Sequence, residues 1–182
     1  MKRELENIIK GCLKKDRKSQ FLFFEMFSPW AYTICRRYVY DSNKAKEVLQ
    51  DAFLRIFSKL DAYDSSKGEL KSWMARILIN CSLTTTKKEA FNDSFMSLSN
   101  MTKEPISEDV FFQFTADDIM KFLHEMPLGY KTIFNLSVMD EFTHKEIAAQ
   151  LGISEITSRS QLRKAKIWLQ DNISKNSIKA NF

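Results

Sequence analysis

The spacing of the apolar residues restricts the fold of this sequence more than any other feature. Along several stretches these residues recur every three or four positions, which places them on one face of a helix. The 182 residues include only four glycines and three prolines, and they lack the regular turn signals of a β-sandwich. We therefore predict an all-α protein. The clearest stripe, near the N-terminus, consists of Leu5, Ile8, Ile9, Cys12 and Leu13.

A second helix is expected to begin at Ser28 and Pro29. Serine is a common N-cap. Proline is favoured at the first helical position, because the backbone N–H that it lacks would have no hydrogen-bond acceptor within the helix. The aromatic run FLFFEMF at 21–27 precedes this signal. We expect the helix to run to about Tyr40.

Two more helices follow before residue 88. Asn43 is the expected N-cap of a helix over 44–60, in which one face is apolar and the other is charged. The polar segment 61–68 is typical of a turn, and helical spacing resumes over 69–88.

The charges divide the chain into three parts. Residues 1–88 carry a formal charge of +8, residues 89–120 carry −6 and residues 121–182 carry +3, within a total of +5. Helical spacing also fails between the two basic parts, so we predict two small helical domains, 1–88 and 115–182, joined by a flexible acidic linker, 89–114. The basic parts suit a nucleic-acid partner, although a solvated charged surface explains such imbalances in many proteins.

The cysteines and the N-terminus indicate the cellular compartment in which the protein is expected. Cys12, Cys35 and Cys81 are widely spaced and odd in number, which suits neither a disulfide framework nor a metal site. The N-terminus lacks the apolar core of a signal peptide, and no stretch approaches the roughly 18 apolar residues of a membrane span. We predict a cytoplasmic protein without membrane insertion.

The segment 142–169, FTHKEIAAQLGISEITSRSQLRKAKIWL, has the pattern of a helix-turn-helix. Thr143 and Glu146 form a capping box that starts the first helix. Gly152 can adopt the left-handed conformation that ends this helix, and Ser154 can cap a second helix that runs to about Gln170.

The second helix of this pattern has two faces. Leu162, Ala165 and Leu169 form a packing stripe, while hydroxyl and basic side chains lie mostly outside it. A positive face that donates hydrogen bonds suits the major groove and its phosphates. A helical hairpin with a solvated basic side is the alternative interpretation.

The segment 125–169 resembles region 4 of bacterial sigma factors of the extracytoplasmic-function (ECF) branch, without a gap. In that family this domain binds the upstream promoter element and the flap of the polymerase β subunit. The family usually has a small residue at Ile156, an apolar one at Ser158 and a basic one at Gln161, so its promoter sequence does not transfer to this chain. The upstream-element contacts that the resemblance implies are Ile156, Thr157, Arg159, Ser160, Arg163 and Lys164.

The N-terminal part shows an independent resemblance. Residues 44–60 resemble sigma region 2.2, which grips the clamp helices of the polymerase β′ subunit. Lys44 and Lys46 depart from the family, which commonly has acidic residues there. Without the resemblance, a solvated helix face would be the preferred interpretation. The implied polymerase-binding residues are Glu47, Leu49, Gln50, Asp51, Phe53 and Arg55.

Residues 72–80 resemble regions 2.3 and 2.4, which capture one melted strand of the downstream element. An extruded base needs an aromatic or apolar platform and hydrogen bonds to its edge. For Trp73 we expect core packing rather than base stacking. The residues implied to contact the downstream element and its melted strand are Tyr63, Ser65, Lys67, Arg76, Asn80 and Lys87.

The sequence thus predicts an ECF-type sigma factor that binds core RNA polymerase and promoter DNA. The resemblance also implies an anti-sigma partner. The acidic linker is either a solubilising tether or a segment that threads a basic channel of the polymerase. No cofactor or metal is expected, because His124 and His144 lack a ligand pattern and no glycine-rich phosphate loop is present; we expect His144 on a helix surface.

Two other classes of protein remain as alternatives to a sigma factor. One is a helix-turn-helix transcriptional regulator, and the other is a helical interaction module that never touches DNA. The resemblance to region 2 argues against the former.

Overall fold

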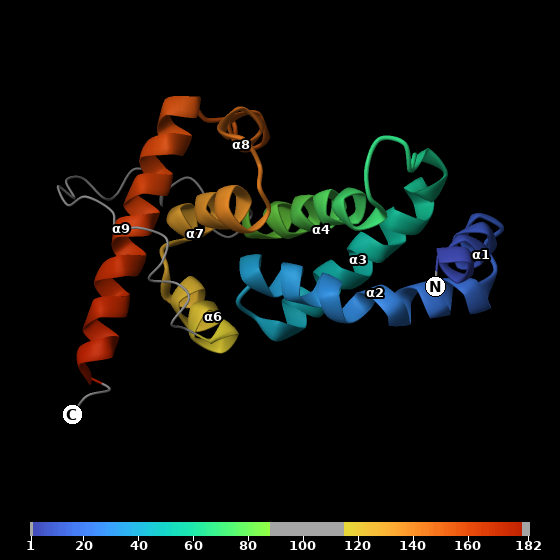
Figure 1. Ribbon diagram of the computed structural model, residues 1–182, viewed down its shortest axis with the longest axis horizontal. Coiled ribbons are helices and arrows are strands. Elements are labelled where there is room, and N and C mark those ends of the chain that lie inside the picture. Colours follow the sequence, from blue (N-terminus) through green and yellow to red (C-terminus); the bar gives the residue numbers. More distant parts are fainter. Residues whose placement is uncertain (1, 88–114, 180–182) are drawn as a thin grey trace. The chain divides into compact units, whose positions relative to one another are not determined.

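The computed structural model describes residues 2–87 and 115–179, which form helices and contain no strand (Figure 1). Two compact units, Met1–Glu89 and Ala90–Phe182, divide the chain. The all-α prediction is confirmed for the described residues. The predicted linker, 89–114, lies outside them.

The first unit is a helical bundle. Helix α1 packs on α2, and α2, α3 and α4 pack on one another. A short 3₁₀ turn, η1, follows α3. The bounds are α1 Lys2–Leu13, α2 Arg17–Tyr38, α3 Ser42–Lys59, η1 Leu60–Ala62 and α4 Leu70–Lys87.

Helix α2 is continuous through Pro29, so the predicted helix start at Ser28 was wrong. The N-cap is Asp16, whose carboxylate accepts a hydrogen bond of 2.8 Å from the Ser19 N–H. Proline inside a helix removes one backbone hydrogen bond to the residue four positions earlier, here the exposed Glu25. The buried aromatic side chains that precede Pro29 hold the helix in place.

Phe23 lies at the centre of this aromatic core. Its ring centroid lies 4.7 Å from that of Phe27 on the same helix. It lies 6.4 Å from Phe53 and 5.7 Å from Phe57, both on α3. Burial of these rings explains why the run at 21–27 is helical, since each large aromatic side chain stabilises the packed helix by several kcal/mol (roughly 3–5 kcal/mol on truncation).

Helix α3 begins earlier than the sequence predicted. Asp41, not Asn43, is its N-cap, and the Asp41 carboxylate accepts hydrogen bonds from the N–H groups of Asn43 (2.8 Å) and Lys44 (2.9 Å). These donors keep the pKa of Asp41 below its usual value, led by the bond from Lys44.

The second unit is built on one long helix, α9. Helices α6, α7 and α8 all pack on it, and α8 lies beside its N-terminal end (Figure 1). The core includes Tyr130 and Phe134 of α7 with Ala165 and Leu169 of α9. The bounds are α6 Ala116–Glu125, α7 Leu128–Phe134, the π-helical turn η3 Asn135–Met139, α8 His144–Leu151 and α9 Glu155–Lys179.

Helix α9 runs past Gln170, where the sequence placed its end. The additional turns continue the packing stripe, because Ile173 is buried in the same core as Leu169. In the described parts of the chain, no helix combines the length and hydropathy of a membrane span.

Candidate nucleic-acid interface

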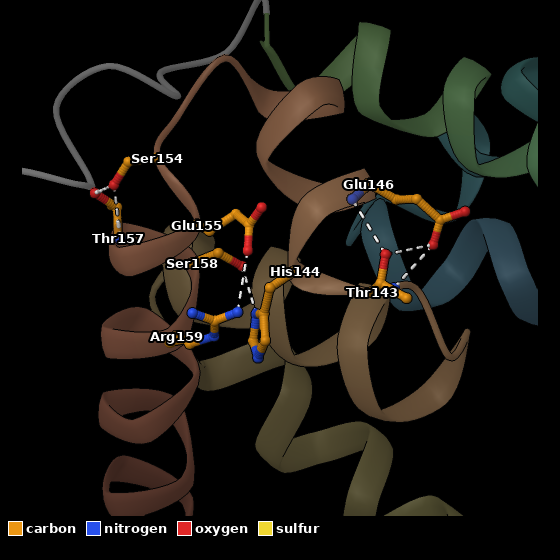
Figure 2. Close-up of polar contacts among 8 residues, drawn as sticks. All are labelled: Thr143, His144, Glu146, Ser154, Glu155, Thr157, Ser158 and Arg159. Atoms are coloured by element: carbon orange, nitrogen blue, oxygen red, sulfur yellow. Dashed lines mark hydrogen bonds and ion pairs between the residues drawn. The ribbon is translucent and has the colours of Figure 1, made fainter.

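The helix-turn-helix forms as the sequence predicted. The Thr143 hydroxyl accepts a hydrogen bond from the Glu146 N–H (3.3 Å), and the Glu146 carboxylate accepts one from the Thr143 N–H (2.9 Å) (Figure 2). Gly152 ends α8 in the left-handed region at φ 71°. Ser154 then caps α9 by accepting a bond of 3.0 Å from the Thr157 N–H. The capping box, the left-handed glycine and the serine cap together fix where each helix starts and stops.

A hydrogen bond between side chains joins the two helices of the motif. His144 Nδ1 lies 2.8 Å from Ser158 Oγ (Figure 2). Ser158 is fully buried, whereas His144 is half-buried, so the histidine that we expected on a helix surface is partly covered by α9. The family's apolar residue at position 158 is here replaced by a hydroxyl that is satisfied across the helix pair.

The outer face of α9 carries the predicted upstream-element residues. Ile156 is 77% exposed, and Arg159, Ser160 and Arg163 are also exposed. Thr157 and Lys164 are half-buried. Because the buried stripe lies on the other side of the helix, all six predicted residues reach a surface that a DNA groove could meet.

Several polar side chains on this face have partners within α9 or its cap. Arg159 donates a hydrogen bond of 3.0 Å to the Glu155 carboxylate, in an ion pair whose two side chains are exposed (Figure 2). The hydroxyls of Ser154 and Thr157 lie 2.8 Å apart, and Ser160 donates to the Thr157 carbonyl at 3.0 Å. Glu155 was not among the predicted site residues, although its i, i+4 spacing from Arg159 signals this pair.

The predicted polymerase-binding residues divide between the two faces of α3. Glu47, Gln50, Asp51 and Arg55 are exposed on one face. Leu49 and Phe53 are buried at 7% and 3% exposure, so they hold the helix against the bundle. Of the six predicted residues, only the four polar ones are exposed enough to contact a partner protein.

Sequence reasoning missed Leu54 on the same helix. It is 69% exposed and lies three and four positions from Asp51 and Gln50, on the polar face. It falls outside the apolar stripe expected along 44–60, and the family resemblance supplied no role for it. Its position in the helical repeat, on the same face as Gln50 and Asp51, could have indicated an exposed leucine.

The third predicted set lies on the 61–68 turn and on α4. Tyr63 donates a hydrogen bond of 3.1 Å to the Gly68 carbonyl, and its ring centroid lies 5.6 Å from that of Trp73. Trp73 is half-buried and packs on this ring. Arg76 and Asn80 follow it at spacings of three and seven residues, so all three share one side of α4, where Arg76 and Asn80 are both exposed.

The turn itself is ordered by Asp64. Its carboxylate accepts hydrogen bonds from the Ser66 hydroxyl (2.7 Å) and N–H (2.9 Å), and these bonds lower the pKa of Asp64. Lys67 forms an exposed ion pair of 3.7 Å with it. Ser65 is exposed, and Lys87 is the last residue of α4, with a side chain outside the described set.

The cysteines are buried free thiols. Burial raises the pKa of Cys12 and Cys35 to about 11, so these thiols stay protonated at neutral pH. No cluster of residues that could hold a metal ion occurs within the described ranges.

Two family models match the two units. The model for sigma-70 region 2 matches residues 23–91, and the model for sigma-70 region 4 matches residues 116–169. The region 4 match contains the whole helix-turn-helix up to Leu169. The region 2 match contains α3, the 61–68 turn and α4.

Relatives and solved structures match across both units. The ECF RNA polymerase sigma factor SigW of Bacillus subtilis is 20% identical over 95% of this chain and 98% of its own length. RpoE of Cereibacter sphaeroides, also an ECF RNA polymerase sigma factor, is 21% identical over 88% of this chain and 91% of its own length.

Two solved complexes share the fold. The structure of CnrH with the cytosolic domain of CnrY covers 92% of this chain and 96% of that one, with a TM-score of 0.51 and 14% identity. The sigma factor RpoE of Bartonella quintana, in complex with the anti-sigma factor NepR, covers 84% and 95%, with a TM-score of 0.55 and 18% identity.

A region 2 bundle followed by a region 4 helix-turn-helix defines a protein of the sigma-70 class. The two domains occur together and in order, and the curated relatives that span almost the whole chain are ECF sigma factors. The chain therefore belongs to the ECF family of RNA polymerase sigma factors.

Proposed function

We propose that this chain binds core RNA polymerase and directs it to a specific set of promoters. The observation that carries the proposal is the presence, in one chain, of an exposed polar face on α3 and an exposed basic face on α9. The first lies in the region 2 match and the second in the region 4 match. A protein with both faces can hold an enzyme and read duplex DNA.

The α3 face would hold the polymerase. Gln50, Asp51 and Arg55 offer hydrogen-bonding groups around the exposed Leu54. An apolar side chain ringed by polar groups is the arrangement of an interface hot spot, because the rim excludes water from the centre. We assign this face to the β′ clamp helices, and we assign part of the second unit to the β flap.

The 61–68 turn and α4 would capture the melted strand. Tyr63 and Trp73 form an aromatic pair at the base of the turn, with Arg76 and Asn80 further along the same side of α4. Stacking on an aromatic side chain stabilises an exposed base by roughly 1–3 kcal/mol. This gain offsets the cost of unstacking, so the chain needs no nucleotide hydrolysis of its own.

An anti-sigma factor is a further proposed partner. The CnrH structure holds the cytosolic domain of CnrY, and the Bartonella RpoE structure holds the anti-sigma factor NepR. We propose that a protein of this class masks one or both faces of this chain until a signal releases it.

Run-off transcription tests the proposal. The purified chain is added to core polymerase from the same cell on a library of promoter fragments, and transcripts are sequenced. We expect a subset of templates to yield transcripts that require the chain. Retention of the chain on immobilised core polymerase without transcription from any template would favour the interaction module, and failure of both assays would reject a sigma factor.

A further inference from the structure

Ile156 has the largest exposed fraction among the exposed large hydrophobic side chains described in this chain, at 77%. It is the second residue of α9, directly after Glu155. A single exposed hydrophobic residue is ordinary on a protein surface. Its position in the first turn of a recognition helix is what requires an explanation, because that turn is the part that enters the major groove.

The polar residues around Ile156 are engaged with one another. The Thr157 hydroxyl lies 2.8 Å from that of Ser154, and Ser160 donates to the Thr157 carbonyl at 3.0 Å. Arg159 is paired with Glu155 at 3.0 Å. The Ser160 hydroxyl must give up its present bond before it can donate to a base edge, and Arg159 has one of its five N–H donors engaged with Glu155. Ile156 has no such bond to break.

The chemistry of the groove identifies what an isoleucine can read there. Thymine presents a 5-methyl group in the major groove, whereas the other three bases present only polar groups and ring C–H. An apolar side chain gains free energy by covering that methyl, and it leaves donors and acceptors unpaired if it meets another base.

From the geometry and the pairing of its neighbours we propose that Ile156 is a specificity-determining residue that reads one thymine of the upstream promoter element through its 5-methyl group. The inference rests on the proposed sigma function and names what the first turn of α9 recognises. Recognition at that base pair is apolar, while the charged residues further along α9 contribute to affinity.

Uracil substitution tests the inference. Upstream elements are first selected from a randomised library of duplexes with the holoenzyme, the full chain bound to core polymerase. Each thymine of the selected element is then replaced singly by deoxyuridine, which removes only the methyl group. Binding of each duplex to holoenzymes carrying the wild-type chain or Ile156→Ala is measured at fixed salt.

We expect one position at which uracil weakens wild-type binding by about fourfold, the equivalent of about 0.8 kcal/mol for one buried carbon group. With Ile156→Ala, thymine and uracil at that position should bind equally, and Ile156→Val should give an intermediate ratio. Uracil at the other thymines should have the same effect on both proteins. Because the side chain is exposed, the variant should unfold at the wild-type temperature.

Two other results would reject the inference alone. One is a selected element without thymine at the recognition positions, and the other is equal uracil effects in the wild type and Ile156→Ala. In either case promoter-specific binding persists, so the proposed function stands. A holoenzyme that selects no sequence at all would overturn both proposals.

Discussion

His144 Nδ1 and Ser158 Oγ lie 2.8 Å apart, and their hydrogen bond joins α8 to the buried side of α9. The bond thus links α8 to α9, the helix that carries Ile156 and Arg159. If α9 enters a DNA groove as we propose, the angle between the two helices sets its approach, and this bond would affect recognition without touching DNA.

Removal of this bond should loosen the motif by a measurable amount. We expect Ser158→Ala to lower the stability of the α8–α9 pair by about 1 kcal/mol, the usual net value of one hydrogen bond. Hydrogen exchange of the α8 amides in the full chain measures the change. The double variant with His144→Ala should cost less than the sum of the two single changes.

Ser160→Ala is the matched control for Ser158→Ala. Ser160 is exposed, and its hydroxyl donates to a carbonyl of its own helix. Removal of the Ser160 hydroxyl should leave the hydrogen-exchange rates of the α8 amides unchanged. Equal effects of the two serine variants would show that the His144 bond contributes nothing specific.

Arg159→Ala should weaken binding to the selected promoter element by about 1 to 3 kcal/mol if the guanidinium contacts a base. The bond to Glu155 uses one of its five N–H donors, so the guanidinium can keep that bond and still donate to a base. Fluorescence anisotropy with the holoenzyme, on the selected duplex and on a scrambled one, measures the loss. An equal loss on both duplexes would instead identify a phosphate contact.

Glu155→Gln tests the role of the ion pair separately from the role of the Arg159 guanidinium. This variant keeps Arg159 and removes a negative charge from the N-terminal end of α9, which we propose faces DNA. Repulsion from the phosphates falls, so affinity should be unchanged or higher on both duplexes. A loss comparable to that of Arg159→Ala would show that Glu155 is needed to orient Arg159.

Leu54→Ala should weaken association with core polymerase by about tenfold, because truncation removes roughly 1.5 kcal/mol of apolar burial from the interface. Leu54 is 69% exposed in the free chain, so the unfolding temperature of the Leu54→Ala variant should be close to that of the wild type. Leu13→Ala, at an exposed leucine of α1, is the control and should bind normally. Biolayer interferometry on immobilised core enzyme gives the dissociation constants; equal affinities for all three proteins would exclude Leu54 from the interface.

Asp41 gives a prediction for acid pH. Its pKa is lowered by the hydrogen bonds it accepts in the folded state, so folding favours the charged form. The contribution is fully present above the unfolded pKa of about 3.9 and is lost as the pH falls through the lower folded value. Asp41→Asn keeps a good cap that does not titrate, so its stability should fall less steeply below about pH 4.

Urea unfolding of wild type and Asp41→Asn at several pH values measures this difference. At pH 7 the two curves should lie close together. Carbon NMR of the Asp41 carboxyl supplies a direct check. A titration midpoint at or above the unfolded value would contradict the capping argument.

Sequence patterns located the helix-turn-helix well because its signals are local. The Thr143–Glu146 box, Gly152 and Ser154 each act within a few residues of the chain, and the structure has all of them. The His144–Ser158 bond joins residues fourteen positions apart, and no local rule detects such a pair. Leu54 was missed because the contact candidates on this helix came from the family resemblance, and a position outside the apolar stripe does not by itself mark a leucine as a contact residue.

The error at Ser28 has a different cause. Ser-Pro is a strong local signal for a helix start, but tertiary burial of Phe23 and Phe27 extends the helix across it. Local capping is worth roughly 1 kcal/mol, whereas each buried aromatic ring contributes more than that. Aromatic burial therefore outweighs the capping preference and decides where α2 begins.

Replacement of Pro29 tests this account of α2. Within a continuous helix, Pro29→Ala restores a backbone N–H that can reach the Glu25 carbonyl, and proline costs about 3 kcal/mol relative to alanine in a helix interior. Part of the gain is offset because proline also restricts the unfolded chain, so we expect Pro29→Ala to raise the free energy of unfolding by about 1 to 2 kcal/mol. Ser28→Ala is the control: it should cost about 1 kcal/mol if Ser28 caps a separate helix, and almost nothing if α2 is continuous. Urea denaturation of the full chain measures both variants, and a destabilised Ser28→Ala would restore the helix boundary that the sequence suggested.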